Sequence, residues 1–91
     1  MTNTTPRQSA SQILRETQDL LHTAGIDTRL NLGAGTRGPF LEAAGGDIVV
    51  IPSDRRGRVR ISTPTSYESP VTRTSGADTA LYIREYLASA A

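Results

Sequence analysis

The sequence predicts a two-layer α+β domain: an antiparallel sheet of three or four strands with N- and C-terminal helices packed on one face. Three observations predict this fold class. Apolar residues recur at helical spacing near both ends of the chain. Between the ends, short apolar or alternating runs are divided by turn-forming residues, as in consecutive strands. The length of 91 residues leaves room for a single hydrophobic core.

Composition limits the domain organisation and the surroundings. Residues 1–8 are rich in Thr, Asn and Pro without periodicity, so we expect a disordered tail before one domain of residues 9–91. The absence of cysteine excludes disulfides and thiolate zinc sites. There is no apolar stretch of the length that a signal peptide or membrane span requires, and we expect a cytoplasmic protein without a membrane partner. The formal net charge of +1 means that nucleic acid would have to be bound by a local basic cluster.

The first helix is expected to begin after Ser9, because Ser9 and Gln12 have the spacing of a capping box. Gly25 suits the left-handed position that follows a helix, and Ile26 is placed to pack back on Leu21 as in a Schellman motif. At 100° per residue, one apolar arc of this helix contains Ala10, Ile13, Leu14, Thr17, Leu20, Leu21 and Ala24.

Four segments then predict strands. Residues 28–32 alternate at period 2. Residues 40–44 are too few for periodicity to separate a strand from one helical turn, and we favour the strand. The continuous β-branched run at 48–51 predicts a central strand. After a tight hairpin turn at 53–57, alternation around Val59 and Ile61 predicts a further strand.

The remainder is an irregular segment and a closing helix. Residues 62–76 are rich in Ser, Thr and Pro, although 71–74 could add a short edge strand. Ser75 and Asp78 repeat the capping spacing. The closing helix that follows has an apolar arc made of Ala80, Ile83, Tyr86 and Leu87.

A formal G-x-G-x-x-G motif at Gly33, Gly35 and Gly38 follows a predicted strand, and Asp54 lies about twenty residues beyond it. Residues 29–54 resemble the first motif of Rossmann-type methyltransferases. The resemblance implies a glycine turn at 33–38 that approaches S-adenosylmethionine or a nucleotide, and a ribose contact from Asp54. However, the segment after Gly38 offers barely one turn for the crossover helix of that fold. We therefore favour a plain hairpin loop and expect no cofactor.

Four arginines, Arg55, Arg56, Arg58 and Arg60, cluster around the second predicted hairpin. Two lie in the turn and two share the outward face of the next strand, so all four could converge on phosphates, as in β-ribbon readers of nucleic acids. The alternative is a solvated hairpin whose charges suppress edge-to-edge aggregation.

No catalytic constellation is apparent. His22 lies on the polar side of the first helix near its C-terminus, where the helix dipole favours a cation. The carboxylates are dispersed singly, without the spacing of metal ligands. We expect no metal site and no enzymatic activity.

Residues 48–51 place apolar side chains on both faces of the sheet, yet two helices cover one face only. Segment 62–76, a second copy of the chain or a different protein must cover the other face. The candidate partner-binding residues are Val49, Ile51, Tyr67 and Arg73.

Our favoured hypothesis is a small accessory or regulatory module, of a kind that phages also encode, acting through a protein partner or a homodimer. Nucleic-acid binding by the arginine hairpin is the second hypothesis, and a degenerate nucleotide or S-adenosylmethionine site at 33–38 is the third.

Overall fold

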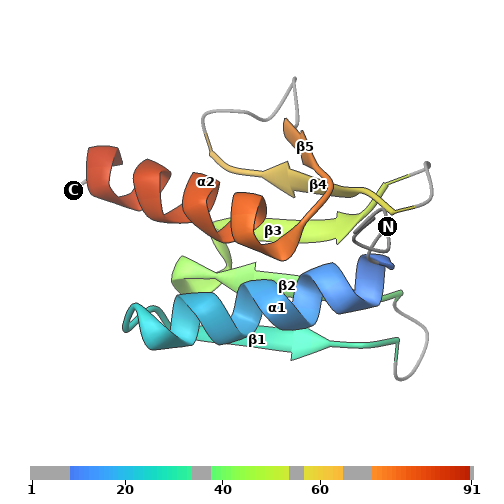
Figure 1. The fold of residues 1–91 in the computed structure, drawn as a ribbon. Helices are drawn as coiled ribbons and strands as arrows, with labels where there is room; N and C mark the ends of the chain where they lie inside the picture. The colour runs from blue at the N-terminus through green and yellow to red at the C-terminus, as the bar shows by residue number, and fades with distance from the viewer. Residues whose placement is uncertain (1–8, 34–37, 54–56, 65–70, 91) are drawn as a thin grey trace, which may run out of the picture.

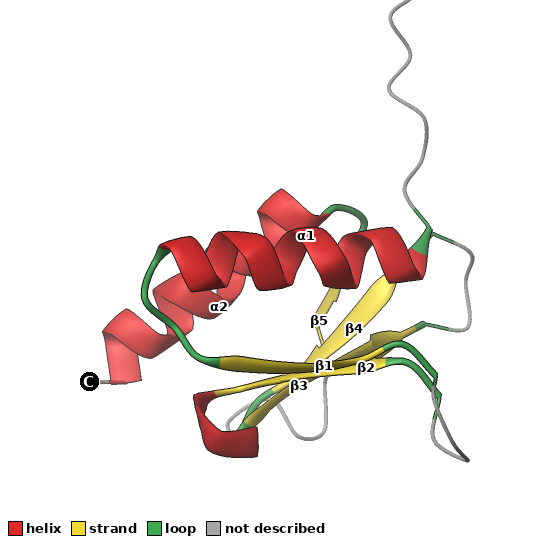
Figure 2. Ribbon diagram, turned by 90° about the horizontal axis from the view of Figure 1, so that it is seen from below, coloured by secondary structure: helices red, strands yellow, loops and turns green. Residues whose placement is uncertain are grey.

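Helices α1 (Ala10–Thr23) and α2 (Gly76–Ala90) cover one face of an antiparallel sheet in the computed structural model (Figures 1 and 2). The structure describes residues 9–33, 38–53, 57–64 and 71–90. The predicted α+β fold class is confirmed. The sheet has five strands rather than three or four, because the segment that we considered as an optional edge strand does join it.

The sheet is a meander in which spatial order equals sequence order and every neighbouring pair is antiparallel. The predicted central strand lies in the middle, with two strands on each side. The segment near 40–44 forms a strand, as favoured, and its last residue opens a short 3-10 turn, η1 (Ala44–Gly46). The strands are β1 (Thr28–Asn31), β2 (Phe40–Ala43), β3 (Ile48–Pro52), β4 (Val59–Ser62) and β5 (Val71–Arg73).

Both ends of α1 are formed by the local interactions that the sequence predicts. The Gln12 amide donates to the Ser9 hydroxyl oxygen over 3.2 Å, and the Ser9 amide donates to Gln12 Oε1 over 2.8 Å. At the other end, Gly25 has a φ of 79°, and the Ile26 amide donates to the Leu21 carbonyl over 2.9 Å. This is the Schellman geometry, so the capping box and the C-terminal stop are confirmed.

Most of the predicted apolar arc of α1 faces the sheet. Ile13, Leu14, Thr17 and Leu21 are fully buried. Leu20 and Ala24 are exceptions, because Ala24 is exposed and 39% of the surface of Leu20 remains exposed. Leu20 borders a shallow groove on the outer side of the helix layer together with Leu81 of α2, so its apolar surface is only partly used.

The two helices run in the same direction across the sheet, and the start of α2 meets the middle of α1 (Figure 1). The Ser75 hydroxyl accepts from the Asp78 amide over 3.1 Å, which confirms the predicted cap of α2. Gly76 is buried, and a Cβ on this residue would lie 2.5 Å from Glu16 Cβ. The helices therefore approach each other at a position that only glycine fits.

The core lies between the helices and the sheet. Its strand members are the residues that alternate toward the helices, and all are at most 2% exposed: Leu41, Ala43, Ile48, Val50, Val59 and Ile61. They pack against Ile13, Leu14, Leu21, Ala80 and Ile83 of the helices. This core identifies the helix face of the sheet. The cross-strand register then assigns each of the remaining strand residues to the helix face or to the opposite face.

Two turns lie at the two ends of the central strand β3. Residues Ala44, Gly45 and Gly46 in the turn between β2 and β3 all have positive φ, and Asp47 after them returns to a φ of −66°. Figure 2 shows that η1 projects from the sheet on the side away from both helices. The turn between β3 and β4 is closed by the Ser53 amide, which donates to the Arg58 carbonyl over 2.9 Å.

Among the described residues, no helix has the length and apolar character needed to cross a membrane.

Candidate interaction surface

The sheet has a second face, which we call the open face, turned away from α1 and α2. Figure 2 shows the helices on one side of the sheet only. Because side chains alternate along each strand, the register places the following residues on the open face: Arg29, Asn31, Phe40, Glu42, Val49, Ile51, Arg60, Ser62 and Thr72. Of the elements that the structure describes, only η1 lies on this side.

Strand β3 supplies apolar side chains to both faces, as predicted. Ile48 and Val50 are 0% and 1% exposed on the helix face. Val49 is half-buried on the open face, and Ile51 is 36% exposed there. The open face therefore has an apolar centre on its middle strand that the described part of the chain leaves accessible to water.

This apolar centre forms one wall of a hollow of about 570 Å³, which we call the Phe40 hollow. Its lining consists of Gly38, Pro39, Phe40, Glu42, Val49, Ile51 and Pro52. Most of these residues are apolar, and Glu42 contributes the single carboxylate. The hollow can therefore take an apolar group that ends in a cation.

A second hollow of about 620 Å³ lies toward the other end of β3, and we call it the η1 hollow. It is lined by Gly46, Asp47, Val49, Ser62, Thr63 and Pro64. Val49 belongs to both hollows, and Glu42 and Gly46 also border a third one of about 310 Å³. The open face is thus concave around Val49, with η1 standing at its margin.

Charged side chains border the apolar centre. Arg29 on β1 is in register with Glu42, and Arg60 on β4 is in register with Ile51. An apolar centre surrounded by polar groups that include arginine is the usual anatomy of a protein–protein interface. A uniformly basic surface, as expected of a phosphate-binding sheet, is interrupted here by Glu42 and Asp47.

Of the four predicted partner-binding residues, the structure brings Val49 and Ile51 together. Arg73 is in register with Val59 and therefore lies on the helix face. Its guanidinium carbon lies 5.2 Å from the centroid of the Tyr82 ring on α2. Arg73 therefore does not share a surface with Val49 and Ile51, because the register of β5 turns it to the opposite side. Tyr67 lies outside the described residues.

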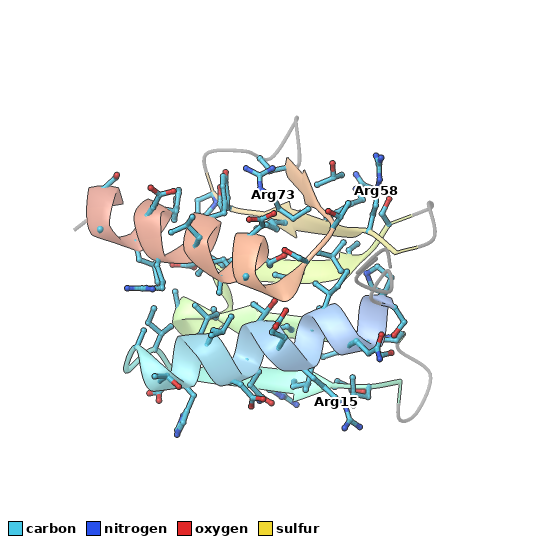
Figure 3. All side chains as sticks on the ribbon, in the orientation of Figure 1. Arg15, Arg58 and Arg73 are labelled. Carbon is cyan, nitrogen blue, oxygen red and sulfur yellow. The ribbon has the colours of Figure 1, made fainter. Side chains whose placement is uncertain are left out.

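Of the arginine cluster, Arg58 and Arg60 are described, and Arg55 and Arg56 lie outside the described residues. Arg58 is two residues from Arg60, so alternation puts both on the open side, as predicted for an outward-facing pair. Figure 3 shows Arg58 at the turn end of β4, well separated from Arg73. Convergence of all four arginines on a phosphate backbone stays a prediction.

The glycine motif lies in a hairpin connection. β1 and β2 are adjacent and antiparallel, whereas a dinucleotide fingerprint requires a strand followed by a crossover helix. The Gly33 amide donates to Asn31 Oδ1 over 2.8 Å, which is a local Asx turn. The hairpin interpretation is confirmed, and the expectation from the methyltransferase-like motif is wrong in its structural context. Gly35 and Asp54 lie outside the described residues.

His22 is the residue that the sequence analysis considered for catalysis. His22 is exposed on α1. Within the described ranges, no group of three or more His, Asp or Glu side chains could hold a metal ion.

The sequence analysis missed Phe40 and Glu42 as members of the candidate surface. A usable signal was present, because β2 alternates between Leu41 and Ala43 on one face and Phe40 and Glu42 on the other. Their link to Val49 and Ile51 depends on the register of β2 with β3, which the sequence does not state.

Comparison of this chain with protein-family models, with curated proteins and with solved structures finds no match.

Proposed function

We propose that this protein is a non-enzymatic binding module that acts through protein contacts made by the open face. One observation carries the proposal: Val49 and Ile51 present β-branched side chains at the centre of a sheet face that the described elements leave uncovered. Burying such side chains against a partner contributes roughly 25 cal/mol per Å² of apolar area. A sheet that stayed open would forgo this stabilisation and would favour nonspecific association.

The distribution of polar groups supports a protein partner. Arg29, Glu42 and Arg60 surround the apolar centre with charges of both signs. Mixed charge around an apolar centre orients a protein partner and excludes wrong ones by like-charge repulsion. Arginine is also over-represented at such surfaces, because it combines an apolar stem with a planar cation.

Site-specific photo-crosslinking tests the proposal. A photo-reactive phenylalanine analogue is introduced at Ile51 on the open face or at Leu81, which is 50% exposed on α2. Both variants are produced in the native host and irradiated, and the adducts are identified by mass spectrometry. We expect a discrete protein adduct from position 51 and none of comparable yield from position 81. Absence of an adduct at 51, or equal and diffuse labelling at both positions, would contradict the proposal.

Nucleic-acid binding is the second candidate, and it is favoured by the placement of Arg58 and Arg60 on one side of β4. If these residues contact phosphates, affinity for duplex DNA should fall with salt at a log–log slope of roughly −0.9 per contact. Replacing both residues, Arg58→Gln with Arg60→Gln, should then flatten the slope by about two units. Fluorescence anisotropy over a salt series measures this slope. Our proposal expects weak DNA binding at physiological salt and little change in the double variant.

A further inference from the structure

The open face carries opposite charges on the two sides of its central strand. Glu42 on β2 is in register with Val49, and Arg60 on β4 is in register with Ile51. A rotation of 180° about an axis parallel to β3 exchanges the β2 side with the β4 side. The same rotation, applied to a second copy facing the first, therefore places Arg60 of each copy over the β2 side of the other, which carries Glu42.

We propose that the open face binds the open face of a second copy of this chain, across a two-fold axis that runs along β3. The inference rests on the proposed function and specifies its partner. The two sheets pack face to face in the aligned manner of a β-sandwich. Val49 and Ile51 then lie against the same residues of the second copy, and Arg60 of each copy enters the Phe40 hollow of the other.

The position of Arg60 fits this hollow. Leu41 is in register with Val50, so Phe40 lies beside Ile51 on the β2 side. Arg60 lies beside Ile51 on the β4 side. The two-fold rotation therefore maps the position of Arg60 in one copy onto the position of Phe40 in the other.

The chemistry of the hollow also fits an arginine. A guanidinium is attracted to the face of an aromatic ring such as that of Phe40, and its apolar stem can lie along Val49 and Ile51. Glu42, the one carboxylate in the lining, supplies the matching charge. Within β4, Arg60 is the basic side chain that the rotation brings to this place.

The shape of the open face agrees with the same arrangement. η1 projects from the connection between β2 and β3, on the open side (Figure 2). The rotation carries η1 of the second copy to the place where the start of β3 lies beside the end of β4, and there the η1 hollow is lined by Ser62, Thr63 and Pro64. Each projection therefore faces a hollow, and every contact is made twice, as a closed dimer requires.

Sedimentation velocity with charge reversal tests the inference on the full chain at about 1 to 100 μM. The wild-type chain is expected to be a dimer in the upper part of this range. Glu42→Arg and Arg60→Glu each place like charges at both symmetry-related contacts, and each should weaken association by at least about tenfold. The double variant, Glu42→Arg with Arg60→Glu, restores opposite charges and should recover most of the association.

Matched controls change the same charges on the helix layer. Arg15→Glu on α1 (Figure 3) and Glu85→Arg on α2 alter exposed residues and should leave the dimer intact. Circular dichroism of every variant establishes that it is folded. If a single reversal unfolds the chain, Arg60→Gln and Glu42→Gln replace it and should weaken association by a smaller factor in the same direction.

The outcomes separate this inference from the proposed function. A wild-type chain that stays monomeric throughout the range overturns the dimer, and so does a double variant no better than the single reversals. If the chain is monomeric while position 51 crosslinks to a different protein, the proposed function stands and the self-association fails. If the chain is monomeric and position 51 forms no adduct, both fail. Association with duplex DNA that depends on Arg60 replaces both by the nucleic-acid alternative.

Discussion

Strand β3 has four consecutive β-branched apolar residues, and alternate members of the run have different surroundings. Ile48 and Val50 are almost completely buried beneath the helices, whereas Ile51 keeps 36% of its surface exposed and Val49 is half-buried. Neither residue type nor position in the strand explains this difference. The helix layer explains it, because α1 and α2 both pack on one side. A continuous apolar run therefore identifies a strand that needs cover on two sides, and the described helices of this chain cover one of them.

The charged residues follow the same division. On the helix face, Arg73 lies over the Tyr82 ring and is used within the fold. On the open face, Arg29 and Arg60 border an apolar centre. An arginine on the helix face should therefore contribute to folding, while one on the open face should contribute to association. A change on the helix side and a matched change on the open side should therefore have different effects.

The largest difference is expected between two isoleucines of β3. Ile48→Ala should reduce the free energy of unfolding by about 2 to 5 kcal/mol, because it leaves a cavity in a closed core. Ile51→Ala should cost about 1 kcal/mol or less in the monomer, because its side chain already contacts water. Urea denaturation at low protein concentration measures both. Equal losses would mean that the open face is as well covered as the helix face.

Two glycines provide the next comparison. Gly76→Ala should destabilise the fold by about 1 to 3 kcal/mol, because the added Cβ meets Glu16 and forces the helices apart. Gly38→Ala, at the edge of the Phe40 hollow, should change stability by at most about 0.5 kcal/mol, since its Cβ would meet nothing within 4 Å. Thermal unfolding of both variants measures these changes in stability. A gain in stability from Gly76→Ala would show that the helices do not approach as closely as described.

Two serines test a smaller effect. Ser75→Ala removes the side-chain cap of α2 and should cost about 1 kcal/mol, because the Asp78 amide loses its acceptor. Ser62→Ala, on the open face of β4, should stay within about 0.5 kcal/mol of the wild type. Denaturant unfolding of both variants, compared at the same dependence of the free energy of unfolding on denaturant, measures the two changes in stability. A cost at Ser62 as large as that at Ser75 would indicate that its hydroxyl has a structural role.

The smallest difference concerns two arginines. Arg73→Gln should cost about 0.5 to 1 kcal/mol through the lost contact with Tyr82, and a double-mutant cycle with Tyr82→Leu should recover that coupling. Arg60→Gln should leave the stability of the monomer unchanged within about 0.5 kcal/mol. Its effect should appear in sedimentation instead. A coupling of zero between Arg73 and Tyr82 would remove the distinction that we draw between the two arginines.

Local chemistry made several elements predictable. The Ser9–Gln12 box and the Gly25 stop involve residues at most five apart, so their hydrogen bonds can be anticipated from spacing alone. The β-branched run at 48–51 likewise predicted a central strand, because such side chains fit a pleated surface buried on both sides. The two-layer arrangement followed from the order of these elements.

Contacts between distant segments made the remaining features unpredictable. Phe40 and Glu42 join Val49 and Ile51 on one surface through the register of β2 with β3, and a shift by one residue would have turned them to the other face. The register of β5 turned Arg73 toward Tyr82, although the sequence analysis had grouped it with Val49 and Ile51. Alternation along a strand specifies two sets of side chains without saying which set the helices cover, since that depends on long-range packing. The sequence predicted that both helices pack on one face, and the register then decides which strand residues share the other face.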